Sequence, residues 1–182
     1  DLRLYGKYRA LRDYAAFTAL DAAQRKLIDN ELRDFRLGGA ELSDADKATY
    51  KALQEELADL STRFEEHLLD ATNAWTLHIE DATQLAGIPP DVLAEARAAA
   101  EAAGQPGWTL TLRMPCYLPV MQYARDRDLR RRMHEAYSTR ASELGADPAW
   151  DNSPLITRTL ELRRAAARLL GYASYAEVAL VP

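Results

Sequence analysis

The sequence is short of the residues on which many extracellular and metal-dependent proteins rely, with one cysteine and three histidines in 182 residues. Because Cys116 is alone, an intrachain disulfide is excluded, and this favours a reducing compartment, so we expect a cytoplasmic protein. No stretch approaches the ~20 consecutive apolar residues that cross a bilayer, so no membrane partner is expected. The formal net charge of −5 disfavours a general affinity for nucleic acid.

What is present is typical of a globular protein. Hydrophobic residues make up 48% of the chain and charged residues 28%, a balance that excludes general disorder. A chain of this length is enough for one domain with a core. It starts at Asp1, without an initiator methionine and inside an amphipathic stretch, and it stops abruptly at Pro182. We therefore expect residues 1–182 to be a single helical domain and a fragment of a longer chain.

Apolar residues at steps of three and four predict helices over most of the chain. The longest apolar stripe follows Ser43 and should bury one helix face continuously; it consists of Tyr50, Leu53, Leu57, Leu60, Phe64 and Leu68. Asp21 and Gln24 form a capping-box pattern at the start of an earlier helix, which Gly38-Gly39 should end. Further helices are predicted over 2–14, 91–103, from about 120, from about 153 to 170, and from 175.

Two segments have the alternation of strands instead. Apolar residues alternate with polar ones over about 74–80 and again over about 108–113. Pro115 and Pro119 are expected to break the chain after the second segment, with helix resuming around Val120. The predicted fold class is therefore mainly α, a multi-helix domain with one small two-stranded β-ribbon.

The histidines do not form a metal-binding motif. A zinc-protease helix needs His-Glu-x-x-His, because residues four apart place both imidazoles on one face. His134-Glu135 begins such a motif, but Ser138 stands where the second histidine is required. His67 with Asp70 and His78 with Glu80 are incomplete pairs, and we interpret them as ordinary, partly exposed histidines. No metal-binding residue is predicted.

Other candidates for chemistry are equally incomplete. Cys116 lacks a basic neighbour or a helix N-terminus that would lower its pKa, so a small buried thiol is the better interpretation. The arginine-rich run 125–132 could contact phosphate, but the interleaved Asp126 and Asp128 favour a solvated helix face with local ion pairs. Acidic residues between 44 and 59 are interpreted as another solvated face. No catalytic or cofactor-binding residue is predicted.

Four tyrosines permit a further interpretation. Tyrosine offers apolar area together with a hydrogen bond, so such residues could line a peptide groove, although they also fill helix interfaces routinely. The four are Tyr117, Tyr123, Tyr137 and Tyr172.

The chain resembles the oligopeptidase A and thimet oligopeptidase family of zinc metallopeptidases. The similarity is strongest at 136–142 (Ala-Tyr-Ser-Thr-Arg-Ala-Ser) and is also clear at 69–75 and 115–121. Shorter agreements extend it over essentially the whole chain, at 8–13, 32–35, 85–89, 150–153 and 169–172.

This resemblance implies properties that composition and spacing do not. The family contains almost entirely helical cytosolic enzymes that cleave oligopeptides in a deep channel, with zinc on a His-Glu-x-x-His helix and a later glutamate. Those residues lie downstream of the region matched here, so none is assigned to this chain. The resemblance implies a non-catalytic N-terminal scaffold, part of a channel wall, whose partner is the catalytic half. The parent would bind zinc and oligopeptides, whereas this stretch alone would be inactive and hold no zinc.

Two alternatives remain. One is a standalone helical interaction domain without catalysis, because any amphipathic helical domain has a similar composition. The other is a small metal-dependent enzyme built on the loose histidine pairs. A fragment should expose a large apolar area and self-associate, whereas the metal-dependent enzyme should bind metal in stoichiometric amount.

Overall fold

The computed structural model describes residues 1–181, which fall into two compact units. The first unit consists of residues 1–60 and 157–181, and the second of residues 61–156. Whether they act as the single domain expected from the sequence stays a prediction.

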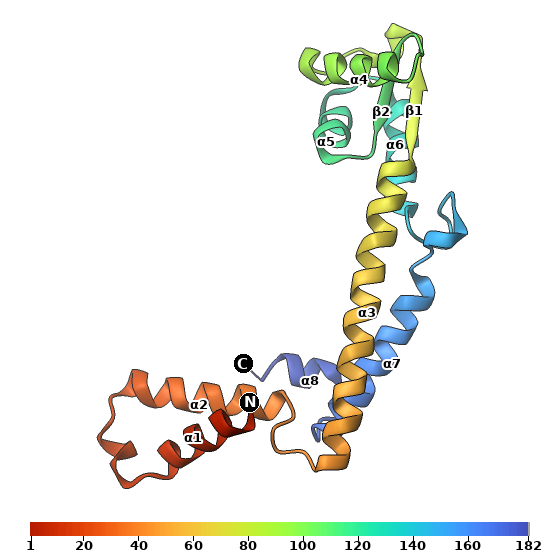
Figure 1. Cartoon of the computed structure of the whole chain (residues 1–182). Helices are drawn as coiled ribbons and strands as arrows, with labels where there is room; N and C mark the ends of the chain where they lie inside the picture. The colour runs from red at the N-terminus through yellow and green to blue at the C-terminus, as the bar shows by residue number, and fades with distance from the viewer. Residues whose placement is uncertain (182) are drawn as a thin grey trace. The chain divides into compact units, whose positions relative to one another are not determined.

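The fold class is confirmed as mainly helical, with one two-stranded antiparallel sheet in the described residues (Figure 1). The helices are α1 (Leu2–Asp13), α2 (Ala22–Leu37), α3 (Asp44–Ala74), α4 (Pro90–Ala102), α5 (Met114–Tyr123), α6 (Arg127–Thr139), α7 (Ser153–Leu169) and α8 (Tyr175–Ala179). The strands are β1 (Thr76–Ile79) and β2 (Trp108–Thr111), and three short 3₁₀ helices cover Ala15–Ala19, Ala82–Leu85 and Pro148–Trp150.

In the first unit, α1 and α2 lie side by side (Figure 1). The capping box predicted for α2 is present: Asp21 accepts from the Gln24 N–H, and Gln24 accepts from the Asp21 N–H. The helix ends at Leu37, and Gly39 has φ +83°, a left-handed conformation that glycine adopts without a steric penalty. The ring of Phe35 packs at 5.7 Å from that of Tyr5, which holds α1 against α2.

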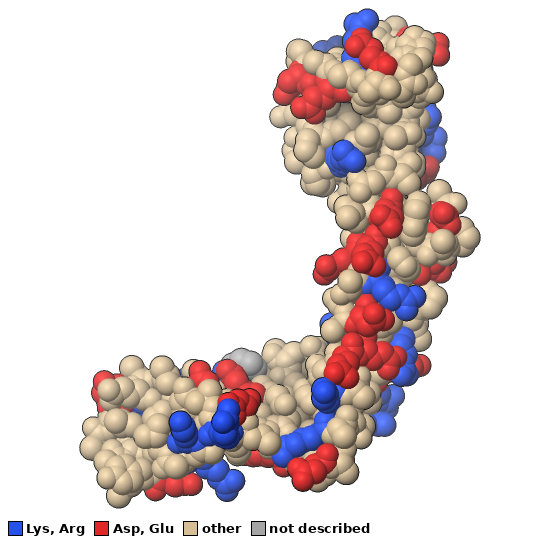
Figure 2. Space-filling view, in the orientation of Figure 1, with Lys and Arg blue, Asp and Glu red and all other residues tan. Residues whose placement is uncertain are grey.

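The predicted long helix is α3, but its apolar stripe is covered less than expected. Of the six stripe residues only Leu60 is buried, and Phe64 remains 36% exposed. Figure 2 shows acidic side chains gathered along the side of α3 that faces the viewer. In the first unit, α3 is joined to α7 by Arg158, whose Nε and Nη2 donate to the two carboxylate oxygens of Glu56 at 2.6 and 3.0 Å.

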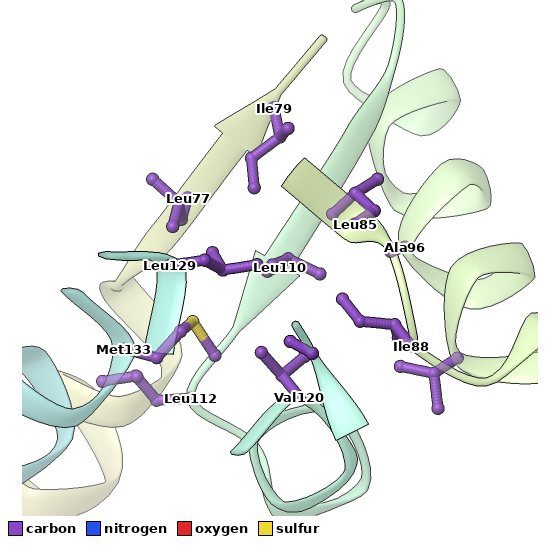
Figure 3. Close-up of a cluster of buried hydrophobic side chains, with 12 residues drawn as sticks. Leu77, Ile79, Leu85, Ile88, Ala96, Leu110, Leu112, Val120, Leu129 and Met133 are labelled. Atoms are coloured by element: carbon purple, nitrogen blue, oxygen red, sulfur yellow. The ribbon is translucent and has the colours of Figure 1, made fainter. Parts of the chain in front are cut away.

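The second unit contains the main core, built around the β-ribbon (Figure 3). The strands pair Leu77 with Leu110 and Ile79 with Trp108, close to the predicted boundaries. Leu110 is fully buried and meets Leu129 of α6 at the centre of the cluster. Gly107 lies where a Cβ would come within 2.3 Å of the Ile79 carbonyl oxygen, so only glycine lets β2 start so close to β1.

The helix expected to resume around Val120 begins earlier than predicted. Helix α5 begins at Met114 and contains both Pro115 and Pro119, instead of resuming at Val120. Pro115 lies in the first turn, where its N–H is not needed. Pro119 removes one helical hydrogen bond, to the Pro115 carbonyl. The fully buried side chain of Val120 holds the helix against the ribbon, so packing outweighs that local loss.

Candidate functional site

The three histidines lie on three different elements of the second unit, each with its own polar neighbour. The Nδ1 of His67 on α3 lies 2.9 Å from the side-chain oxygen of Asn152, and the Nε2 of His78 on β1 lies 3.7 Å from a carboxylate oxygen of Glu80. On α6, the Nδ1 of His134 lies 3.3 Å from the Ser138 hydroxyl. Within residues 1–181, no three His, Cys, Asp or Glu side chains are grouped as a metal ion would need.

Cys116 lies in the first turn of α5, partly buried, so the expectation that it has no helix N-terminus beside it was wrong. Its sulfur accepts a hydrogen bond from the Thr111 N–H at 3.4 Å, which ties α5 to β2. Burial raises the pKa of the thiol, so the nucleophilic thiolate is disfavoured at neutral pH. The geometry is that of a structural thiol.

The arginine-rich run lies on α6 and the residues just before it, and Arg131 is ion-paired within the helix. Arg131 pairs with Asp128 at 2.6 Å and with Glu135 at 3.0 Å, one turn away on either side. These two carboxylates raise the pKa of the Arg131 guanidinium. Arg130 donates to the backbone carbonyl of Ala124. This arrangement matches the local ion pairs predicted for a solvated helix face.

The structure brings together two of the four tyrosines singled out from the sequence. The rings of Tyr117 on α5 and Tyr137 on α6 stack with centroids 4.0 Å apart and an interplanar angle of 14°. Burial raises the pKa of Tyr117, so its phenol stays neutral. Tyr123 is on the same unit but largely exposed, and Tyr172 belongs to the other unit. A groove lined by all four is therefore not formed within either unit.

Arg140 continues this stack, and the sequence analysis did not single it out. Its guanidinium lies 3.5 Å from the centroid of the Tyr137 ring, a close cation–π contact. Its Nε donates to the Thr72 hydroxyl of α3 at 3.1 Å, and its Nη1 donates to the Tyr137 carbonyl. The usable signal was its spacing, three residues after Tyr137, inside the stretch that carries the strongest family resemblance.

A cavity of about 420 Å³ lies beside Arg140 in the second unit. It is enclosed by the end of α3, the start of β1, the end of α6 and the loop that follows α6. Two indole rings, of Trp75 and Trp150, contribute to its walls, and one acidic residue, Asp147, lies on the loop side. The remaining wall residues are small or aliphatic: Ala71, Ala74, Thr76, Leu112, Ala136, Thr139, Ala141, Leu144, Gly145 and Ala146. Such a cavity can hold an apolar group beside a charged one; it offers binding and no catalytic pair.

Comparison with known proteins agrees with the resemblance. The sequence model described as "Peptidase family M3" matches residues 120–182. Oligopeptidase A of Salmonella typhimurium is 45% identical over 178 residues, and oligopeptidase A of Escherichia coli is 44% identical over 174. An Arabidopsis thaliana protein named probable cytosolic oligopeptidase A is 34% identical over 184 residues. The alignments cover 97%, 95% and 97% of this chain.

The same alignments cover 26% of each relative, so the chain spans about a quarter of the length of the proteins it matches. With close to half of its residues identical to the bacterial relatives over nearly its full length, the chain belongs to the oligopeptidase A group of peptidase family M3.

Proposed function

We propose that this chain is a non-catalytic helical scaffold of an oligopeptidase A-like zinc metallopeptidase that hydrolyses oligopeptides. The observation that carries the proposal is the 45% identity to oligopeptidase A over 97% of the chain but only 26% of that relative. The mainly helical fold supports it, and in the second unit helices pack around the small ribbon.

The residues of this chain do not fit a zinc ion. The sequence has no His-Glu-x-x-His, and within the described part of the chain the histidines lie with different polar partners. In the proposal the metal belongs to the parent enzyme and is held by residues outside this sequence, and the catalytic half of the parent is the partner of this region.

The cytoplasm is the proposed location. One relative is named a probable cytosolic oligopeptidase A, and the single cysteine suits a reducing compartment. No helix in residues 1–181 is both long enough and apolar enough to cross a membrane.

The test compares two samples with one control. The chain alone should give no turnover of a quenched fluorescent oligopeptide, with added zinc or with a chelator. A chimera that carries this chain in place of the matched region of Salmonella oligopeptidase A should cleave the same substrate and lose activity with the chelator. The same relative with that region deleted is the control, and it should be inactive.

The outcomes separate the alternatives. Chelator-sensitive turnover by the chain alone would overturn the scaffold assignment and return attention to His67, His78 and His134. A soluble, folded chimera without activity would favour the standalone interaction domain.

A further inference from the structure

The cavity beside Arg140 exists because the helices around it present only small side chains. Ala71 and Ala74 are three residues apart on α3 and so share a face, while Ala136 contributes another methyl group from α6. Any larger residue at these positions would fill the space. The volume of about 420 Å³ lies within the range of small-molecule sites, roughly 300–1,000 Å³.

The apolar part of the cavity is aromatic. Trp75 and Trp150 are both only partly buried, so their rings contribute surface to the cavity as well as to the packing behind them. Leu144 of the loop is 72% exposed and also belongs to the lining. Indole rings bind apolar and aromatic groups through large, rigid contact areas.

The polar part is an oriented guanidinium. The Nε of Arg140 donates to the Thr72 hydroxyl, and its Nη1 donates to the Tyr137 carbonyl. One face of the guanidinium lies over the Tyr137 ring. Within residues 1–181, its Nη2 has no hydrogen-bond partner, so this nitrogen keeps its donors for a ligand. A fixed guanidinium with open donors matches a carboxylate, which accepts charge-assisted hydrogen bonds.

The loop beside Arg140 is also held in a costly conformation. Ala141 has φ +51°, a left-handed conformation that is unfavourable for a residue with a Cβ. Its carbonyl accepts from the Asn152 N–H at 3.1 Å, and the adjacent Ser142 hydroxyl donates to the Thr139 carbonyl at 2.7 Å. Strained backbone persists where surrounding contacts enforce it, and such positions are frequent at binding sites.

We infer that this cavity binds a monocarboxylate that carries an apolar or aromatic side chain, as the C-terminal residue of a peptide does. Arg140 receives the carboxylate and the two indoles receive the side chain. Asp147 also lines the cavity, with one carboxylate oxygen accepting from the Ala149 N–H at 2.8 Å, and its negative charge repels a doubly charged phosphate more strongly than a single carboxylate. The inference goes beyond the proposed scaffold role, because binding requires only this chain.

The experiment uses the cavity tryptophans as the reporter. The chain has three tryptophans, so Trp108→Phe leaves Trp75 and Trp150 as the only indoles. N-acetylphenylalanine added to this variant should give a saturable change in indole fluorescence. Its uncharged amide should bind about tenfold more weakly or worse, since a hydrogen bond to a charged group is lost.

A pair of leucine variants, one that fills the cavity and one that does not, tests whether the ligand binds there. Ala74→Leu, made in the Trp108→Phe background, places a larger side chain at an exposed position of the lining and should abolish the titration. Ala52→Leu is the same change at an exposed position of the same helix, away from the cavity, and should leave it intact. The absence of a saturable change, equal binding of acid and amide, or equal behaviour of the two leucine variants would each overturn the inference. None of these results depends on peptide cleavage by the parent.

Discussion

At the scale of single residues, Asn152 is a buried polar side chain, and burial requires that its amide group find hydrogen-bond partners. It is only 2% exposed, and its amide nitrogen donates to the Phe64 carbonyl of α3 at 3.1 Å. Because that bond uses the amide nitrogen, the side-chain oxygen is the atom that faces His67, and it can only accept. His67 must therefore carry its proton on Nδ1, which leaves Nε2 as the acceptor in the neutral ring.

Replacing Asn152 should destabilise the second unit. In Asn152→Ala both side-chain bonds are lost and a small void is left, so we expect a loss of about 1–3 kcal/mol in the free energy of unfolding. Urea unfolding followed by circular dichroism measures it. Asn73→Ala, an exposed asparagine on the same unit with one bond to Arg113, is the control and should change stability by less than about 1 kcal/mol. Equal losses in the two variants would contradict this assignment.

At the scale of elements, the ribbon and the α3–α7 pair are stabilised by different forces. The ribbon depends on burial of apolar side chains, because two strands alone are only marginally stable in water. Here the strands pack against α4, α5 and α6. The pairing of α3 with α7 in the first unit includes an exposed, two-pronged ion pair between Glu56 and Arg158. The first contribution responds to cavity-forming substitutions and the second to pH.

For the ribbon, Leu110→Ala should cost about 2–5 kcal/mol, because the side chain is fully buried at the centre of the core. Leu118→Ala on α5 is the matched control, since this leucine is 44% exposed and should contribute little. The midpoint of urea unfolding of each variant gives the difference. Similar midpoints for the two variants would show that the cluster is not the stabilising core.

For the ion pair, the hydrogen bonds from Arg158 lower the pKa of Glu56 below its ordinary value of 4.5. The folded chain thus keeps this carboxylate charged at a pH where the unfolded chain protonates it. The stabilisation is therefore present above pH 4.5 and is lost as the pH falls through the lowered pKa.

We expect Glu56→Gln to be less stable than the natural sequence at neutral pH and equally stable at strongly acidic pH. Urea midpoints measured across this range test the effect. Glu55→Gln, whose carboxylate lies 3.6 Å from Lys51 on an exposed face, is the control and should show no comparable pH dependence. A constant difference between Glu56→Gln and the natural sequence at every pH would exclude the ion pair as its cause.

At the scale of the whole molecule, apolar side chains are exposed in both units. Leu27 and Leu160 of the first unit are 56% and 60% exposed, and Leu69 and Leu144 of the second are 60% and 72% exposed. Apolar surface left exposed to water can be buried by association with other protein. The proposed scaffold role accounts for this exposure, because the chain spans 26% of each bacterial relative and the rest of the parent would cover such surface.

The chain on its own should therefore self-associate. Sedimentation velocity should show an average sedimentation coefficient that rises with protein concentration. Leu144→Ser and Leu160→Ser, each at a highly exposed position, should reduce this dependence without lowering the thermal midpoint. A strictly monomeric chain at all concentrations would favour the standalone interaction domain.

The sequence by itself determined the elements and the family. Steps of three and four predicted α3, and the Asp21–Gln24 pattern predicted a capping box that is present, because both signals act between residues close in the chain. Alternation predicted the two strands, whose register follows from which side chains can be buried. The residues at 69–75, 115–121 and 136–142 indicated the peptidase family.

Only the tertiary structure decided how far these elements are covered and which side chains meet. Helix α5 passes through Pro119 because Val120 is buried against the ribbon, and no local rule contains that contact. Arg140 becomes a candidate binding residue because Thr72, 68 positions earlier, orients its guanidinium. The cavity beside it is enclosed by segments far apart in sequence. Contacts of this kind depend on packing between distant parts of the chain. Periodicity and capping signals involve only residues close in sequence, so they do not predict such contacts.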